Sequence, residues 1–269
     1  MTSLQAAFAA AKAEGRAALI GYLPAGFPTV DAGIAAIEVM VEAGVDIVEV
    51  GLPYTDPLMD GPTIQAAVEA ALRAGITTAD VLRTVEASAR TGAASLLMSY
   101  WNPLEHYGVA EVTKALVAGG AAGVITPDLI PDEAGPWIEA TDAVGLDRVF
   151  LVAPSSTDAR IDLTAKASTG FVYAASTMGV TGARSSVSNR AEELVARVRR
   201  FTDRPVAVGL GVSTGAQAAE VARFADGVIV GSALVRCLLD ARTPDEGLEA
   251  LQTLAAELAA GVRGDTSAT

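Results

Sequence analysis

Residues 45–62 read VDIVEVGLPYTDPLMDGP, which contains a strand, a loop and the start of a helix. The opening run of β-branched residues is typical of a strand buried on both faces in a parallel sheet. The Pro- and Gly-rich part that follows leads into helical apolar spacing at Ile64, Val68 and Ala71. Glu49 stands inside the apolar run, where a charge is costly. The segment therefore predicts an α/β fold with a functional carboxylate.

The same strand–helix alternation continues along the chain of 269 residues. The apolar strand-like runs are Ala17–Leu23, Ile47–Gly51, Leu96–Ser99, Gly123–Thr126, Val149–Val152, Phe171–Ala174, Pro205–Gly209 and Gly227–Val230. Helical spacing is found in Thr29–Ala43, Thr78–Arg90, Asp158–Ala167, Asn189–Phe201 and Pro244–Ala260. Eight repeats in this length predict a single (β/α)8 TIM barrel.

We expect this barrel to span residues 1–262 as one domain, with a polar, disordered tail at 263–269. An additional N-terminal helix, Leu4–Glu14, could plug the lower end of the barrel. The alternative is an open doubly wound sheet. It is less well supported because no Gly-x-Gly-x-x-Gly follows the first strand.

Composition narrows the range of partners and compartments. With 19 basic and 32 acidic residues the net charge is −13, which argues against nucleic acid and anionic membranes as partners. The single cysteine, Cys237, excludes an intramolecular disulfide and a multi-cysteine zinc site, and its apolar helical context predicts a buried structural thiol. No signal peptide or membrane span is evident, so we expect a cytoplasmic protein.

Two carboxylates are the leading catalytic candidates. Glu49 ends the second strand, at the barrel face where active sites are built; apolar surroundings would raise its pKa into the range of an acid/base catalyst. The alternative for Glu49 is a helix cap or a partner for an arginine. Asp60 precedes Gly61-Pro62 and a helix, so it could instead be an N-cap. Its proximity to Glu49 and Asp56 on one loop favours a functional role.

Three Gly-rich turns form a second group, at residues 178–183, 209–213 and 231–233. In barrels the turns after the last two strands often hold a phosphate, through backbone N–H groups and a helix N-terminus. No Lys or Arg lies within the turns after strands seven and eight. We therefore expect backbone amides to hold the phosphate.

Other chemistries have little support. The three lysines, Lys12, Lys114 and Lys166, lie in helical stretches, which argues against a Schiff-base aldolase. His106 is the only histidine and lies in a predicted polar loop, 102–108. A multi-histidine metal site is therefore impossible, and we expect no metal.

Glu49–Pro62 matches the long pattern E-x-G-x-P-[FY]-[ST]-D-P-x-x-D-G-P, and in this the chain resembles the α subunit of tryptophan synthase. The resemblance covers essentially the whole length, with supporting segments at residues 24–28, 98–103, 126–129, 179–184 and 231–235. Three positions depart from the family: Met59 replaces a small residue, Met98 a leucine and Tyr22 a phenylalanine.

The resemblance implies a lyase that cleaves indole-3-glycerol phosphate into indole and glyceraldehyde 3-phosphate, a retro-aldol reaction without metal or organic cofactor. Glu49 would be the general acid/base, Asp60 would accept from the indole N–H, Tyr173 would help position Glu49 or the substrate, and Thr181 would hold Asp60 on loop closure. The resemblance assigns phosphate binding to Gly182, Gly211, Gly231 and Ser232, and the indole pocket to Tyr22, Ile64, Met98 and Leu129.

The resemblance also implies an α2β2 complex with a β subunit that carries pyridoxal phosphate. Pro53, Asp56 and Asn102 would contact that partner. Two alternatives remain open from the sequence: a free-standing indole-3-glycerol phosphate lyase, and a protein that mainly activates its β partner.

Overall fold

The computed structural model describes residues 3–176, 184–209 and 211–264. Within these ranges the strands are β1 Ala18–Pro24, β2 Ile47–Gly51, β3 Ala94–Met98, β4 Gly123–Ile125, β5 Asp147–Val149, β6 Leu151–Val152, β7 Val172–Ala175, β8 Val206–Gly209 and β9 Gly227–Val230. The helices are α1 Ser3–Ala13, α2 Val30–Glu42, α3 Pro62–Arg73, α4 Thr78–Arg90, α5 Trp101–Tyr107, α6 Val109–Ala118, the 3-10 turn η1 Pro131–Glu133, α7 Gly135–Val144, α8 Asp158–Ala167, α9 Arg184–Val198, α10 Gly215–Ala222, α11 Ser232–Leu239 and α12 Pro244–Arg263.

The strands form one parallel sheet that closes on itself. Their order is β5-β4-β3-β2-β1-β9-β8-β7-β6, so the two edges are β5 and β6, which only Phe150 separates along the chain. Val149 and Leu151 face the barrel interior, whereas Phe150 packs toward the helices. The alternation of a single strand therefore continues through Phe150. The predicted fifth strand is present as this interrupted pair, and the (β/α)8 barrel is confirmed.

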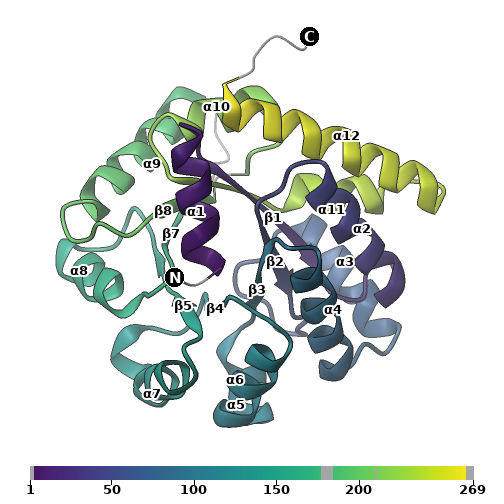
Figure 1. Cartoon of the computed structure of the whole chain (residues 1–269), viewed down its shortest axis with the longest axis horizontal. Helices are drawn as coiled ribbons and strands as arrows, with labels where there is room; N and C mark the ends of the chain where they lie inside the picture. Colours follow the sequence, from purple (N-terminus) through teal and green to yellow (C-terminus); the bar gives the residue numbers. More distant parts are fainter. Residues whose placement is uncertain (1–2, 177–183, 210, 265–269) are drawn as a thin grey trace.

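Helix α1 closes the lower end of the barrel, as expected. Figure 1 shows it lying across the near end of the strands, inside the ring of outer helices. Its buried Leu4 and Phe8 join the interior cluster with Ile20, Ile47 and Phe171, and the Phe8 and Phe171 rings are 5.5 Å apart. The amino-terminal end is thus filled with apolar side chains. The buried Asp147, the first residue of β5, is an exception to this apolar filling.

Two sequence expectations differ from the structure. Trp101–Tyr107 is helix α5 rather than a polar loop. The carboxylate of Asp128, on the loop after β4, accepts the Trp101 N–H at 2.9 Å and caps the helix from a distant segment. Helix α12 continues through Arg263 and ends at the left-handed Gly264, so the tail expected from residue 263 does not begin there. None of the described helices is long and apolar enough to cross a membrane.

Close packing of α10 on α12 generates a prediction about stability. A Cβ at Gly261 would overlap the Gly215 backbone, so Gly261→Ala forces the two helices apart. We expect the free energy of unfolding to fall by about 1–3 kcal/mol, because overpacking outweighs the better helix propensity of alanine. Urea unfolding measures this. Gly135→Ala is the control, since no atom lies within 4 Å of its added Cβ; equal stability of the two variants would contradict the prediction.

Candidate active site

Glu49 occupies the interior of the barrel near the carboxyl end of β2. Its neighbours in register are Tyr22 on β1 and Leu96 on β3. The side chain is 1% exposed, and its Oε1 has no hydrogen-bond partner among the residues that the structure describes. Burial away from water raises the pKa of Glu49 to about 8. The expected rise in pKa is confirmed, and the carboxyl can exchange a proton near neutral pH.

Two tyrosines lie near Glu49, the buried Tyr22 and the partly buried Tyr173, and glycines make room for both. The Tyr22 hydroxyl lies over Gly51, where a Cβ would overlap it, and the Tyr173 hydroxyl lies 2.5 Å from a Cβ built on Gly209. Burial, followed by the charges of Asp60 and Glu49, raises the pKa of Tyr22. Burial and the charge of Glu49 raise the pKa of Tyr173. Both hydroxyls therefore remain neutral in a site that already holds acid groups.

Asp60 is positioned by Tyr100, which the sequence does not predict to lie beside the second carboxylate. The Tyr100 hydroxyl accepts the backbone N–H groups of Leu58 at 3.1 Å and Met59 at 3.0 Å. The same hydroxyl lies 3.4 Å from Oδ1 of Asp60 and can donate to it. Gln65 Nε2 donates to the Asp60 carbonyl at 2.7 Å. The loop is thus held at both its backbone and its carboxylate.

Partial burial raises the pKa of Asp60, and the hydrogen bond from Tyr100 partly offsets that rise. The sequence does hold one indication of the role of Tyr100. This residue comes two positions after β3, so it lies at the same end of the barrel as Asp60. Met59 does not crowd the carboxylate with its bulk, because its side chain is 48% exposed. Its departure from the family pattern changes the outer surface of the loop.

The four residues expected to form an indole pocket belong to, or pack against, one hydrophobic cluster: Tyr22, Ile64, Met98 and Leu129. Two of them meet at the turn after β9. A Cβ on Gly231 would lie 3.4 Å from Tyr22 Cδ1 and 3.7 Å from Ile64 Cδ1. The Gly231 turn therefore borders the apolar side chains that adjoin the carboxylates.

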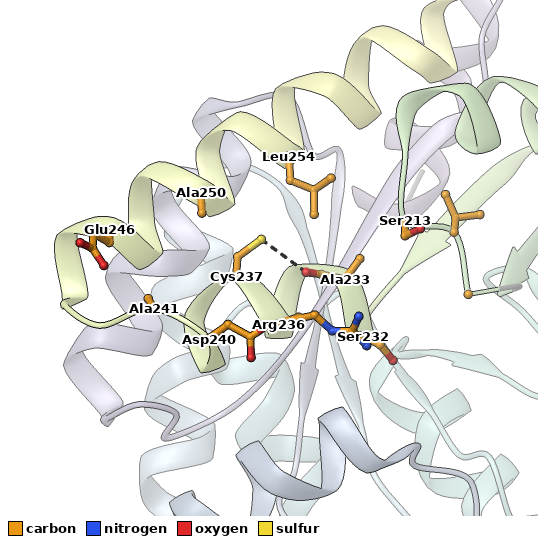
Figure 2. A pocket seen from close by; sticks show the side chains of 12 residues that line it. Ser213, Ser232, Ala233, Arg236, Cys237, Asp240, Ala241, Glu246, Ala250 and Leu254 are labelled. Carbon is orange, nitrogen blue, oxygen red and sulfur yellow. Dashed lines mark hydrogen bonds between the residues drawn. The ribbon is translucent and has the colours of Figure 1, made fainter.

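The expected phosphate residues Gly211 and Ser232 line a cavity of about 670 Å³ beside α11 and α12 (Figure 2). Ser232 is the first residue of α11, and Gly231 is its N-cap. Arg236, one turn into the helix, also lines this cavity. Arg236 lies outside the Gly-rich turns in the sequence, but the helix brings it back to the side of Ser232. Gly182 and Thr181 lie outside the described residues.

Cys237 lines the same cavity and is only partly buried, so the expectation of a buried thiol is wrong. Its Sγ donates to the Ala233 carbonyl at 3.4 Å. The reason is the open space between α11 and α12, into which this face of α11 is directed. Among residues 3–176, 184–209 and 211–264, no group of three or more His, Cys, Asp or Glu could hold a metal ion.

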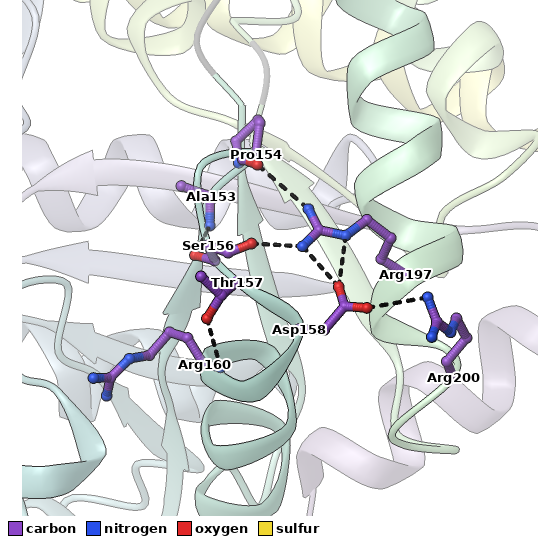
Figure 3. A network of polar contacts seen from close by, with 8 residues as sticks. All are labelled: Ala153, Pro154, Ser156, Thr157, Asp158, Arg160, Arg197 and Arg200. Carbon is purple, nitrogen blue, oxygen red and sulfur yellow. Dashed lines mark hydrogen bonds and ion pairs between the residues drawn. The ribbon is translucent and has the colours of Figure 1, made fainter.

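The loop between β6 and α8 is tied to α9 by a polar network (Figure 3). Arg197 donates to the Ser156 carbonyl at 2.5 Å, to the Pro154 carbonyl at 3.3 Å and to Asp158 Oδ1 at 2.8 Å. Arg200 reaches the other oxygen of Asp158 at 3.2 Å. Arg197 of α9 and Arg200, just after this helix, thereby hold the loop after β6 in place, next to β7, which carries Tyr173.

The expected partner residues differ in exposure. Asp56 and Asn102 are exposed, whereas Pro53 is buried within the chain. Asn102 Nδ2 donates to the Tyr54 hydroxyl at 3.0 Å, which joins α5 to the loop after β2. Large apolar side chains are exposed on the segments that follow β2, β3 and β4: Leu58, Met59, Tyr107 and Ile130.

The family model described as tryptophan synthase alpha chain matches residues 8–263. The tryptophan synthase alpha chain of Acidothermus cellulolyticus is 61% identical over 263 residues, covering 98% of each chain. A crystal structure of tryptophan synthase from M. tuberculosis in an aminoacrylate-bound form is 52% identical with a TM-score of 0.89, covering 97% of this chain and 100% of that one. The chain belongs to the tryptophan synthase alpha chain family.

This likeness extends to more distant relatives. The alpha subunit from Legionella pneumophila str. Paris has the same TM-score of 0.89 at only 30% identity, covering 98% of this chain and 99% of that one. The family and the alpha reaction of tryptophan biosynthesis, a carbon–carbon lyase step, are confirmed. The free-standing lyase and the pure activator are not favoured. In this family the alpha chain is not the cofactor-binding chain.

The raised pKa of Glu49 predicts a pH-dependent stability. The folded protein keeps this proton up to about pH 8, while the unfolded chain loses it near the ordinary glutamate pKa of 4.5. The folded state therefore binds more protons between these values, and Glu49 makes stability fall as pH rises through this window, by up to about 1.4 kcal/mol per pH unit.

Urea unfolding of wild type and Glu49→Gln at several pH values measures this effect, because other titrating groups cancel in the difference between the two proteins. We expect wild type to lose stability relative to the variant across the window. A constant difference from low to high pH would show that the Glu49 pKa is not raised in the folded state.

Proposed function

We propose that this chain cleaves indole-3-glycerol phosphate with Glu49 as the general acid/base. The observation that carries the proposal is a buried carboxyl with a pKa of about 8, one oxygen of which has no partner in the part of the chain that the structure describes. Such a group can be protonated at neutral pH and can also serve as a base once it has given up its proton. Cleavage of this carbon–carbon bond needs both roles in sequence.

The steps balance without a further reactant. Protonated Glu49 gives its proton to C3 of the indole, which leaves a positively charged indolenine, and the Asp60 carboxylate accepts from the ring N–H. The Glu49 carboxylate then takes the glycerol hydroxyl proton. The C–C bond breaks, its electron pair returns to the ring, and the new carbonyl belongs to glyceraldehyde 3-phosphate. Tyr173 would help position Glu49 or the substrate.

Binding follows from the rest of the site. The backbone N–H groups of Gly211 and Gly231, with the Ser232 hydroxyl, are suited to the phosphate at the start of α11. The Gly231 turn borders Tyr22 and Ile64, which would contact the indole together with Met98. Gly182 and Thr181 remain predictions for the phosphate and for loop closure.

The test is the rate of indole release from indole-3-glycerol phosphate, with β subunit added. Loss of a general acid/base costs about 10²–10⁴-fold, so we expect Glu49→Gln to lower kcat by at least about 10²-fold with little change in KM. Glu38→Gln, at an exposed position on α2, is the matched control and should keep wild-type kinetics. Wild-type turnover by the Glu49 variant would remove the carboxyl from the mechanism.

We also propose that the β chain, with its pyridoxal phosphate, docks on the mouth of this barrel. The support is the set of exposed apolar side chains at Leu58, Met59, Tyr107 and Ile130, beside Asp56 and Asn102. These side chains lie on the segments that follow three neighbouring strands. An interface there would cover the substrate opening, so indole could pass to the partner.

Replacing Leu58, which is 76% exposed, by Asp should weaken the α–β complex at least about tenfold by placing a charge in the apolar contact. Sedimentation velocity with purified β subunit measures the dissociation constant. Leu163→Asp is the control, because this 39% exposed leucine lies on α8, outside the proposed surface. Equal affinities of the two variants would place the interface elsewhere.

A further inference from the structure

Arg236 lies where a phosphate group would enter the site. It stands one helical turn after Ser232 on α11, and both residues line the 670 Å³ cavity with Gly211. Figure 2 shows its side chain directed back toward Ser232. Long side chains of a helix take this direction toward the N-terminus. The guanidinium therefore lies toward the N-terminus of α11, where the sequence predicts that phosphate binds.

The guanidinium is available for a ligand. Its Nη2 donates to the Thr63 hydroxyl at 3.3 Å, in an exposed contact, and Arg236 forms no ion pair within the described part of the chain. Two acidic side chains, Asp240 and Glu246, line the outer part of the same cavity. Glu246 is engaged by Arg242 at 3.1 Å. These carboxylates disfavour an anion in the outer part and leave the end beside Ser232 as the favourable place.

We propose that Arg236 recognises the substrate's phosphate dianion, exchanging the Thr63 hydroxyl for a phosphate oxygen. The proposal rests on the proposed function and adds a specificity-determining residue to it. A chain with net charge −13 repels a dianion, and neutral amides offset this only in part. A guanidinium supplies the opposite charge and stronger, charge-assisted hydrogen bonds.

The exchange also connects the two ends of the site. Thr63 is the second residue of α3, three residues after Asp60, and Ile64 follows it against the Gly231 turn. Release of Thr63 by Arg236 therefore changes a contact at the base of the loop that carries the second carboxylate. The Arg236 side chain therefore links phosphate binding at α11 to the position of the loop that carries Asp60.

Calorimetric titration with glycerol 3-phosphate, which needs no turnover, measures the phosphate affinity of the full chain. A hydrogen bond to a charged group contributes about 1.5–3 kcal/mol, so we expect Arg236→Gln to weaken binding by about tenfold or more. KM for indole-3-glycerol phosphate, measured with β subunit, should rise by the same factor, with kcat within about twofold. Arg236→Lys should recover part of the affinity, because it keeps the charge without the planar fork.

Two further variants separate recognition from a structural role. Thr63→Val removes the partner but leaves the guanidinium, so it should bind glycerol 3-phosphate as well as wild type or more tightly. Arg90→Gln, on α4, removes an exposed arginine remote from the cavity and should change nothing. Wild-type phosphate affinity in Arg236→Gln, or an equal loss in Thr63→Val, would overturn the proposal. Failure of wild type to cleave the substrate would instead sink the proposed function, while the binding comparison would still decide the role of Arg236.

Discussion

The site depends on one unfavourable interaction, the burial of the Glu49 carboxyl. Within the described ranges no cation pairs with this carboxyl, and its Oε1 has no hydrogen-bond partner. Leaving such a group unpaired in the interior costs free energy, and the protein reduces that cost by keeping the proton at neutral pH. The same desolvation that raises its pKa to about 8 makes it able to deliver a proton to carbon. An arginine beside Glu49 would stabilise the chain and remove this chemistry.

The fold accommodates the buried Glu49 carboxyl because the two ends of the barrel interior differ in polarity. Leu4 and Phe8 of α1 fill most of the amino-terminal end with apolar groups, whereas Glu49 lies toward the carboxyl ends of the strands. Strand register then places Tyr22 beside Glu49, and Gly51 leaves room for the tyrosine ring. Neutral hydroxyls rather than charges thus surround the carboxyl, and its pKa remains raised.

The alternation of strands and helices could be predicted from the sequence because it depends on local patterns, namely short β-branched runs and helical apolar spacing. These patterns predict the barrel and place Glu49 at its mouth. Contacts between distant segments could not be read in this way. Helix α5 exists because Asp128 caps it across the next loop, and its own residues, including Pro103, look like a polar loop. Tyr100 was missed for the same reason, since its hydroxyl organises residues some forty positions earlier in the chain.

The residues of the Gly-rich turns alone do not reveal every cation near the predicted phosphate site. A helix returns every fourth residue to the same face, so a cation at position i+4 serves the helix N-terminus as well as one in the turn itself. Arg236 meets this condition relative to Ser232, and its contact with Thr63 joins α11 to the start of α3. Asp240 occupies the next i+4 position and lines the same cavity. The positive charge of Arg236 and the negative charge of Asp240 therefore lie on successive turns of one helix. Binding of an anion is favoured at the Ser232 end of the cavity and disfavoured at the Asp240 end.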